Sequence, residues 1–185
     1  YMELTNLSLS LLVKELSPQL HSSRIRKIQE LPNNWLKMTV SKNKKNIQLI
    51  LADNAFFISN HSLTAKQQTS GFGAFLNKQL NLQEIVSIKQ NNFDRVIIIE
   101  TEKFNLVLEI FAKGNIILTD KKNIILAVQT NEAWKDRTLK KRETYKFPSS
   151  KDFSPENINP IKLYTILKKS SGHAVNVIIA HTNIA

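Results

Sequence analysis

The chain has 185 residues, 42% of them apolar, which suffices for one domain with a sizeable core and the start of a second. It has no cysteine, which excludes disulfides, thiolate nucleophiles and cysteine zinc sites and fits an intracellular protein. Its net charge of +11 favours a polyanionic partner, nucleic acid ahead of an anionic membrane surface, although a lysine-rich background composition would give the same charge.

The N-terminal part of the chain predicts a helix followed by strands. Residues 5–17 carry one apolar stripe at helical spacing, typical of a helix that packs on a sheet, and Pro18 is expected to end or kink it. Residues 22–30 alternate between polar and apolar side chains, as a half-buried strand does. Three further strand-like runs follow, separated by turn residues: NWLKMTVS, NIQLILAD and AFFISN.

The middle of the chain predicts a helix and a second set of strands. Residues 61–70 lack periodicity and predict an exposed loop, residues 71–81 a short helix, and residues 85–90 a strand. Residues 94–129 then carry four short apolar runs separated by TEKFN, AKGN and DKKN, which indicates an antiparallel meander. Several of these runs are apolar without alternation, so both faces of this sheet should be covered.

Residues 130–150 are polar and carry basic residues with aromatic residues among them. The basic residues are Lys135, Arg137, Lys140, Lys141 and Arg142, and the aromatic residues are Trp134, Tyr145 and Phe147. Basic side chains pair with phosphate and aromatic rings stack on bases, so the segment is a candidate nucleic-acid contact. A surface loop whose aromatic rings pack against the sheet fits the same residues equally well.

The C-terminal part predicts a second, smaller unit. We divide the chain into a domain of residues 1–150 and a segment of residues 151–185 that begins as a linker. Asn159-Pro160 is a typical helix start, and a basic amphipathic helix follows. The last stretch, from His173, is apolar almost all round, so we expect its helix to be buried by sequence outside this chain or by a second copy, which would make a homodimer.

The residues that usually carry catalysis are missing or scattered. The four histidines have no metal-ligand spacing, and the chain has no nucleophile elbow, no Walker pattern and no convincing carboxylate pair. No apolar run is long enough to span a membrane, and the N-terminal residues show no secretory signal. The sequence therefore predicts a cytoplasmic protein without catalytic activity, cofactor or metal.

The runs DRVIIIE and LEIFAKGNIILTD, with RIRKIQ after the first helix and FGAFLNKQL between them, resemble the N-terminal domain of the NFACT family. These are ribosome quality control proteins of the NEMF and RqcH type, and the likeness leans toward archaeal and eukaryotic members. The resemblance implies an α+β fold, an antiparallel β-sandwich flanked by helices and similar to the N-terminal domain of formamidopyrimidine-DNA glycosylases. The tail resembles the start of the family's helix-hairpin-helix segment.

The resemblance also implies a function and a set of contact residues. Such proteins are non-catalytic adaptors that bind tRNA and a stalled large ribosomal subunit with peptidyl-tRNA, and they recruit aminoacyl-tRNA to extend the nascent chain. The family's Asp-Arg pair for tRNA recruitment matches Asp94 and Arg95, and two basic positions match Arg24 and Lys78. The chain departs from the family pattern at three places: Ser22-Ser23, Asn77 and Glu84.

Two other functions and one structural alternative stay open at the level of the sequence. A DNA glycosylase or lyase would need an N-terminal proline amine, which the start of this chain, Tyr1 to Leu4, does not offer. Adhesion to fibronectin is described for some bacterial relatives, but a secretory signal is missing here. Asp94 and Arg95 alone would equally fit a turn with a surface ion pair worth about 0–1 kcal/mol.

Overall fold

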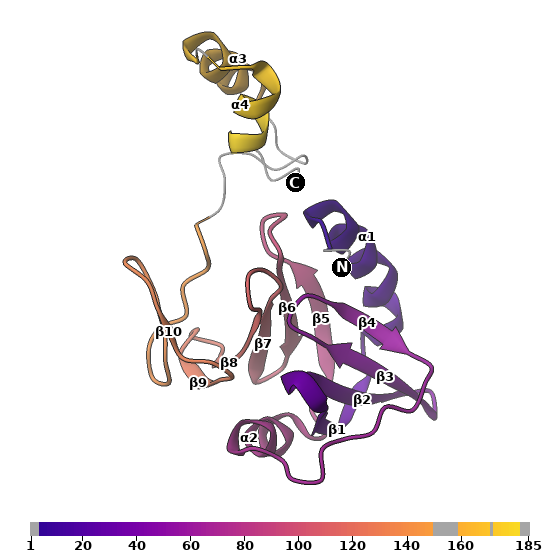
Figure 1. Ribbon diagram of the computed structural model, residues 1–185. Helices are drawn as coiled ribbons and strands as arrows, with labels where there is room; N and C mark the ends of the chain where they lie inside the picture. The colour runs from indigo at the N-terminus through magenta and orange to yellow at the C-terminus, as the bar shows by residue number, and fades with distance from the viewer. Residues whose placement is uncertain (1–3, 150–158, 171, 182–185) are drawn as a thin grey trace.

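The computed structural model of the chain describes residues 4–149, 159–170 and 172–181, and Figure 1 shows its course. In these ranges the α-helices are α1 (Asn6–Leu20), α2 (Gly71–Leu80), α3 (Pro160–Lys169) and α4 (Ala174–His181), with a 3-10 turn at Pro32–Asn34. The strands are β1 (Arg24–Glu30), β2 (Leu36–Lys42), β3 (Lys45–Leu51), β4 (Phe56–Ser59), β5 (Ile85–Gln90), β6 (Val96–Thr101), β7 (Phe104–Glu109), β8 (Asn115–Asp120), β9 (Ile125–Val128), β10 (Glu132–Ala133) and β11 (Thr138–Leu139).

The strands form two antiparallel sheets and a short ribbon. The sheets have the orders β1-β2-β3-β4 and β5-β6-β7-β8-β9, and β10 pairs with β11. Within each sheet every strand pairs antiparallel with the next along the chain, so the predicted α+β organisation with antiparallel sheets is confirmed. The sheets join where the residues after α2 meet the start of β1. There Ile25 N–H donates to the Gln83 carbonyl at 2.8 Å, and Leu82 N–H donates to the Ile25 carbonyl at 2.7 Å.

The main core lies between the inner faces of the two sheets, and α1 and α2 close it at the sides (Figure 1). Helix α1 contributes Leu9, Val13, Leu16 and Leu20, all buried, which confirms the predicted apolar stripe. The helix nevertheless continues through Pro18, where the sequence predicted its end or a kink. Proline in the last turn removes only one helical hydrogen bond, and the complete burial of Leu20 outweighs that loss.

The outer face of the five-stranded sheet is covered by β11 and the segment that follows it. The packed side chains are Val96, Val107, Ile117, Ile125, Leu139 and Tyr145. The segment is held by backbone hydrogen bonds to β9, from Ile125 N–H to the Glu143 carbonyl at 2.9 Å and from Arg142 N–H to the Ile125 carbonyl at 2.8 Å. The prediction that both faces of this sheet are covered is therefore confirmed.

Helix α2 is capped by Ser70, and Glu30 of β1 holds that residue in place. Ser70 N–H donates to the Glu30 carboxylate at 2.9 Å, and the Ser70 hydroxyl donates to the other carboxylate oxygen. Burial raises the pKa of Glu30, but the hydrogen bonds from Ser70 and the charge of Lys66 outweigh burial, so the pKa lies below its ordinary value. The stability that Glu30 contributes is complete above the pKa of an unfolded glutamate and is lost as the pH falls through the lowered folded value.

Asn77, one of the departures from the family pattern, ties α2 to the edge of β1. Its Oδ1 accepts a hydrogen bond from the Ile28 N–H at 2.7 Å. An arginine side chain has donors but no acceptor, so it could not satisfy this backbone group. The departure at this position therefore has a structural cause in this chain.

Gly114, in the turn between β7 and β8, brings the two sheets into close contact. It has a left-handed φ of 66°, and a Cβ at this position would lie 2.3 Å from the Asp53 carbonyl oxygen of the β3–β4 turn. We expect Gly114→Ala to lower the free energy of unfolding by about 2 kcal/mol or more, because left-handed strain and the backbone clash add. Urea denaturation measures this loss.

Gly71→Ala is the matched control for that measurement. Gly71 lies in the first turn of α2, and a Cβ there would meet nothing within 4 Å. Alanine should leave the protein as stable as the parent or slightly more stable, because it favours helix over glycine. Equal losses for the two variants would contradict the role of Gly114.

Helices α3 and α4 follow the predicted linker, which lies mostly in residues 150–158, outside the described residues. Asn159 caps α3 as predicted, its side chain accepting from the Lys162 N–H at 3.0 Å, with Pro160 in the first turn. In α4 Val177 is buried, whereas Val175 is 65% exposed. The expectation of a fully buried last helix is thus not met within the described chain, and its cover by other sequence or a second copy stays a prediction.

Candidate nucleic-acid interface

The β5–β6 turn, residues 91–95, presents Asp94 and Arg95. Asp94 N–H closes the turn by donating to the Asn91 carbonyl at 2.7 Å. Phe93 takes a left-handed φ of 59° and its side chain is buried, which is unusual for a residue with a Cβ and anchors the turn to the sheet. Asp94 and Arg95 are each half-buried, so they do not lie at a fully exposed tip of the turn.

Two neighbouring segments hold this turn in place. Gln90 Nε2 donates to the Asp94 carbonyl at 2.9 Å and to the Asn6 carbonyl, in the first turn of α1, at 3.0 Å. Ile110 N–H, just after β7, donates to the Arg95 carbonyl at 2.7 Å. The two candidate side chains therefore stand on a rigid frame, as binding residues on loops usually do. Sequence reasoning missed Gln90, because a glutamine at the end of a strand carries no signal of its own.

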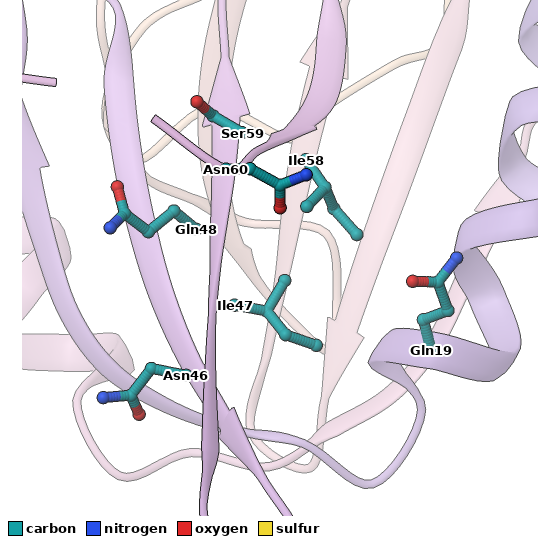
Figure 2. A pocket seen from close by; sticks show the side chains of 7 residues that line it. All are labelled: Gln19, Asn46, Ile47, Gln48, Ile58, Ser59 and Asn60. Carbon is teal, nitrogen blue, oxygen red and sulfur yellow. The ribbon is translucent and has the colours of Figure 1, made fainter. Parts of the chain in front are cut away.

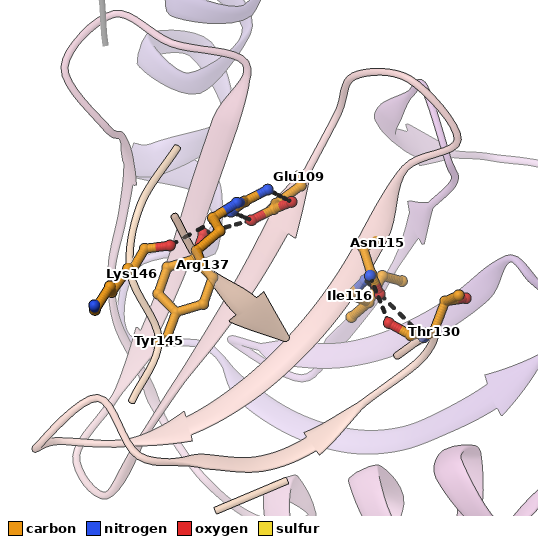
Figure 3. A network of polar contacts seen from close by, with 7 residues as sticks. All are labelled: Glu109, Asn115, Ile116, Thr130, Arg137, Tyr145 and Lys146. Atoms are coloured by element: carbon orange, nitrogen blue, oxygen red, sulfur yellow. Dashed lines mark hydrogen bonds and ion pairs between the residues drawn. The ribbon is translucent and has the colours of Figure 1, made fainter. Parts of the chain in front are cut away.

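Arg137 lies in the interior of the fold, not among exposed basic residues. Its guanidinium forms a bidentate ion pair with Glu109, Nη1 to Oε1 at 2.6 Å and Nη2 to Oε2 at 2.9 Å. The Tyr145 hydroxyl donates to the same Oε1 at 2.8 Å, and Figure 3 shows the three side chains converging. Burial and the Glu109 charge raise the pKa of Tyr145, so its hydroxyl stays protonated. We therefore remove Arg137 from the candidate phosphate contacts and assign it a structural role.

The aromatic residues around this ion pair divide between the two interpretations that the sequence left open. Tyr145 is only 3% exposed and packs against the sheet, as a covering loop requires. Trp134 is 44% exposed, and Phe147, whose ring meets Tyr145 edge-on at 5.0 Å, is 37% exposed. The segment therefore serves as a cover for the sheet and also leaves aromatic surface open to solvent.

Lys141, in the segment after β11, lies beside α2, and Lys140 and Arg142 are its neighbours in the chain. Lys141 Nζ lies 5.5 Å from the centre of the Phe75 ring on α2, and Lys78 occupies the same helix face as Phe75, one turn further on. All of the lysine and arginine side chains here are exposed. We call this surface the α2 patch, and it consists of Lys78, Lys140, Lys141 and Arg142.

The nine candidate residues do not form one site. Arg24 is exposed at the start of β1, and its backbone pairs with that of Glu84 in an isolated antiparallel β-bridge where the two sheets join. Strand β6 runs from beside Arg95 to Thr101, which pairs with Ile85 at that junction, so Arg24 and Arg95 lie at opposite ends of the five-stranded sheet. Lys135 is exposed in the turn of the β10–β11 ribbon. The structure thus separates the Asp94–Arg95 turn from the α2 patch and from Arg24.

A pocket of about 290 Å³ opens between β3, β4 and the end of α1. Its lining residues are Gln19, Asn46, Ile47, Gln48, Ile58, Ser59 and Asn60. Figure 2 shows Ile58 between the amides of Asn60 and Gln19, with Ile47 below them. None of the lining side chains is a carboxylate, imidazole, thiol or amine, so this pocket offers amide hydrogen bonds but no general acid or base.

No group of three or more His, Cys, Asp or Glu in the described ranges could hold a metal ion. No helix of the described chain is long and apolar enough to cross a membrane.

The family described as NFACT N-terminal and middle domains matches residues 5–183 of this chain. The chain belongs to this family. The predicted resemblance is confirmed, and the match to an NFACT domain extends over both the sheets and the C-terminal helices described above.

NFACT relatives and a solved structure support the same assignment. The archaeal Rqc2 homolog aRqcH of Methanocaldococcus jannaschii is 32% identical over 115 residues, which are 60% of this chain and 17% of that protein. Ribosome quality control complex subunit 2 of Saccharomyces cerevisiae is 30% identical over 128 residues, 66% of this chain and 12% of that protein. The N-terminal domain of the fibronectin-binding protein PavA from Streptococcus pneumoniae has a TM-score of 0.81 and 28% identity, covering 96% of this chain and 73% of that one. The chain spans less than a fifth of the length of the first two relatives.

Proposed function

We propose that this chain is the RNA-binding adaptor domain of a ribosome quality control factor. It binds tRNA and the stalled large ribosomal subunit with its peptidyl-tRNA, and it helps to recruit aminoacyl-tRNA for tailing of the nascent chain. The names of its relatives support the quality control role, and that role would place the protein with ribosomes in the cytoplasm.

The observation that carries this proposal is the Asp94–Arg95 turn. The turn is fixed through its backbone by Gln90, which also bonds α1, and by the residue after β7, so the two half-buried side chains are carried on a rigid frame. Arginine offers a planar set of donors suited to phosphate or a base edge, and aspartate can orient that guanidinium or accept from a nucleotide amine or hydroxyl. The α2 patch and the net charge of +11 supply the attraction to the phosphate backbone.

We expect the chain to bind tRNA weakly and with a steep salt dependence. Each phosphate that a basic side chain neutralises should add about 0.7 to 0.9 to the slope of log affinity against log salt. Lys140→Ala with Lys141→Ala should reduce this slope, because both residues belong to the exposed α2 patch. Fluorescence anisotropy of labelled tRNA across a salt series measures the slope.

Lys44→Ala with Lys45→Ala is the control for that series. These lysines are exposed at the β2–β3 turn, and their removal lowers the net charge by the same amount. If both double variants reduce the slope of log affinity against log salt equally, the α2 patch has no specific part in tRNA binding, and general charge attraction accounts for it. Binding that does not change between low and physiological salt would contradict the proposed phosphate contacts.

We propose further that the domain acts without catalysis and that α3 and α4 begin a helix-hairpin-helix segment. The uncharged pocket at β3 and β4 supports the absence of acid–base chemistry there. The competing activity is a DNA glycosylase or lyase, because the family resemblance implies a fold similar to the N-terminal domain of such enzymes. Borohydride trapping on abasic or oxidised-base DNA separates the two, because a covalent adduct would establish the lyase and contradict the adaptor.

A further inference from the structure

Trp134 and Arg137 form a stacked pair at the tip of the β10–β11 ribbon. The backbone N–H of Trp134 donates to the Arg137 carbonyl at 2.8 Å, which closes the turn. The Arg137 guanidinium carbon lies 4.3 Å from the centre of the Trp134 ring, so one face of the indole rests on a cation. With 44% of the residue exposed, the indole keeps substantial surface in contact with solvent.

The guanidinium that supports Trp134 is held from several sides. Besides the bidentate pair with Glu109, Arg137 Nη1 lies 3.4 Å from the Lys146 carbonyl, and its guanidinium carbon is 6.0 Å from the centre of the Phe111 ring. Arg137 itself is only 9% exposed. An exposed tryptophan on a mobile loop would lose conformational freedom on binding, whereas this ring is positioned beforehand.

The ribbon lies at the same end of the five-stranded sheet as the candidate tRNA-recruiting turn. Glu109, which anchors Arg137, is the ladder partner of Val96, the residue after Arg95. Ile110, the next residue along from Glu109, donates its N–H to the Arg95 carbonyl at 2.7 Å. Lys135 is exposed beside Trp134 and offers a cation for a phosphate. An exposed aromatic face, a neighbouring lysine and an arginine-bearing turn therefore share one end of the fold.

We propose that the open face of Trp134 is a stacking platform for an unpaired base of single-stranded RNA, with Lys135 contacting the adjacent phosphate. Base stacking on an aromatic ring tolerates any base and needs a ring face free of neighbours. This site deepens the proposed RNA-binding function and rests on it. It also gives Arg137 a part in binding that differs from the phosphate contact predicted from the sequence: the residue positions Trp134 and does not touch RNA.

The test measures binding of a labelled oligoadenylate and of a fully paired RNA hairpin, by anisotropy, to the parent chain and to two variants. Trp134→Ala should weaken oligoadenylate binding about tenfold, the effect typical of losing one stacked base, and should change hairpin binding little. Trp134→Phe keeps a ring at this position and should retain most of the affinity. Thermal unfolding of both variants confirms that the ribbon still folds.

Tryptophan emission gives a second readout. The sequence has two tryptophans, so a Trp35→Phe variant keeps Trp134 as its single tryptophan. Saturation with oligoadenylate should quench the emission of Trp134. If Trp134→Ala binds oligoadenylate as the parent does and the emission of Trp134 does not change, the platform is refuted while RNA binding stands. If the parent binds none of the three RNAs (oligoadenylate, hairpin and tRNA), both the proposed RNA-binding function and the proposed stacking platform are refuted.

Discussion

Arg137→Ala is expected to lower the free energy of unfolding by about 3–5 kcal/mol, the usual cost of removing one partner of a buried ion pair. The Glu109 carboxylate would keep the Tyr145 hydroxyl but would lose its cation within the interior. The segment that covers the outer face of the five-stranded sheet would lose its anchor at the same time. Urea denaturation at neutral pH measures the loss.

Lys135→Ala is the matched control, because it removes the same charge from the same ribbon at an exposed position. Its stability should stay within about 0.5 kcal/mol of the parent. Adding Glu109→Gln to Arg137→Ala should cost less than the sum of the two single losses, since both changes remove one shared interaction. An Arg137→Ala variant as stable as Lys135→Ala would show that the ion pair is not structural.

Asp94→Ala combined with Arg95→Ala should abolish aminoacyl-tRNA recruitment by the full-length protein and spare its binding to the large subunit. The hydrogen bonds from Gln90 and Ile110 to the turn use the backbone carbonyls of both residues, which alanine retains. The melting temperature should therefore stay within a few degrees of the parent, equivalent to about 1 kcal/mol or less. Pull-down of aminoacyl-tRNA on isolated subunits measures recruitment.

The control for this pair is Glu102→Ala with Lys103→Ala. These adjacent residues also combine an acid with a base in a tight turn, at the other end of β6, and both are exposed. The control should recruit aminoacyl-tRNA as the parent does. Normal recruitment by the Asp94 and Arg95 variant, or its failure to fold, would assign those two residues a structural role.

The strand pattern of this fold could be predicted from the sequence because local signals and tertiary packing agree. The apolar runs of residues 94–129 have strand length and are separated by turn residues, and they form β6 to β9 in that order. Their lack of alternation correctly indicated a layer on each face. The end of α1 could not be predicted, because burial of Leu20 in the assembled core overrides the local effect of Pro18.

The candidate site could be predicted only in part, because the partner of a charged side chain is set by the fold. Arg137 stands among exposed lysines in the sequence, and its partner Glu109 lies 28 residues earlier in an apolar run. Nothing local marks that glutamate as buried. The Asp94–Arg95 turn was found through the family resemblance, whereas its contacts with Gln90 and Ile110 follow from the packing of α1 and β7 around it.

Sedimentation of the full-length protein with large ribosomal subunits tests the adaptor function most directly. The protein should sediment with subunits that carry peptidyl-tRNA, and much less with vacant subunits, because tRNA contacts supply part of the affinity. The preference should weaken as salt is raised, in line with phosphate contacts. Equal sedimentation with both kinds of subunit, or none with either, would contradict the assignment of this domain as an RNA-binding adaptor.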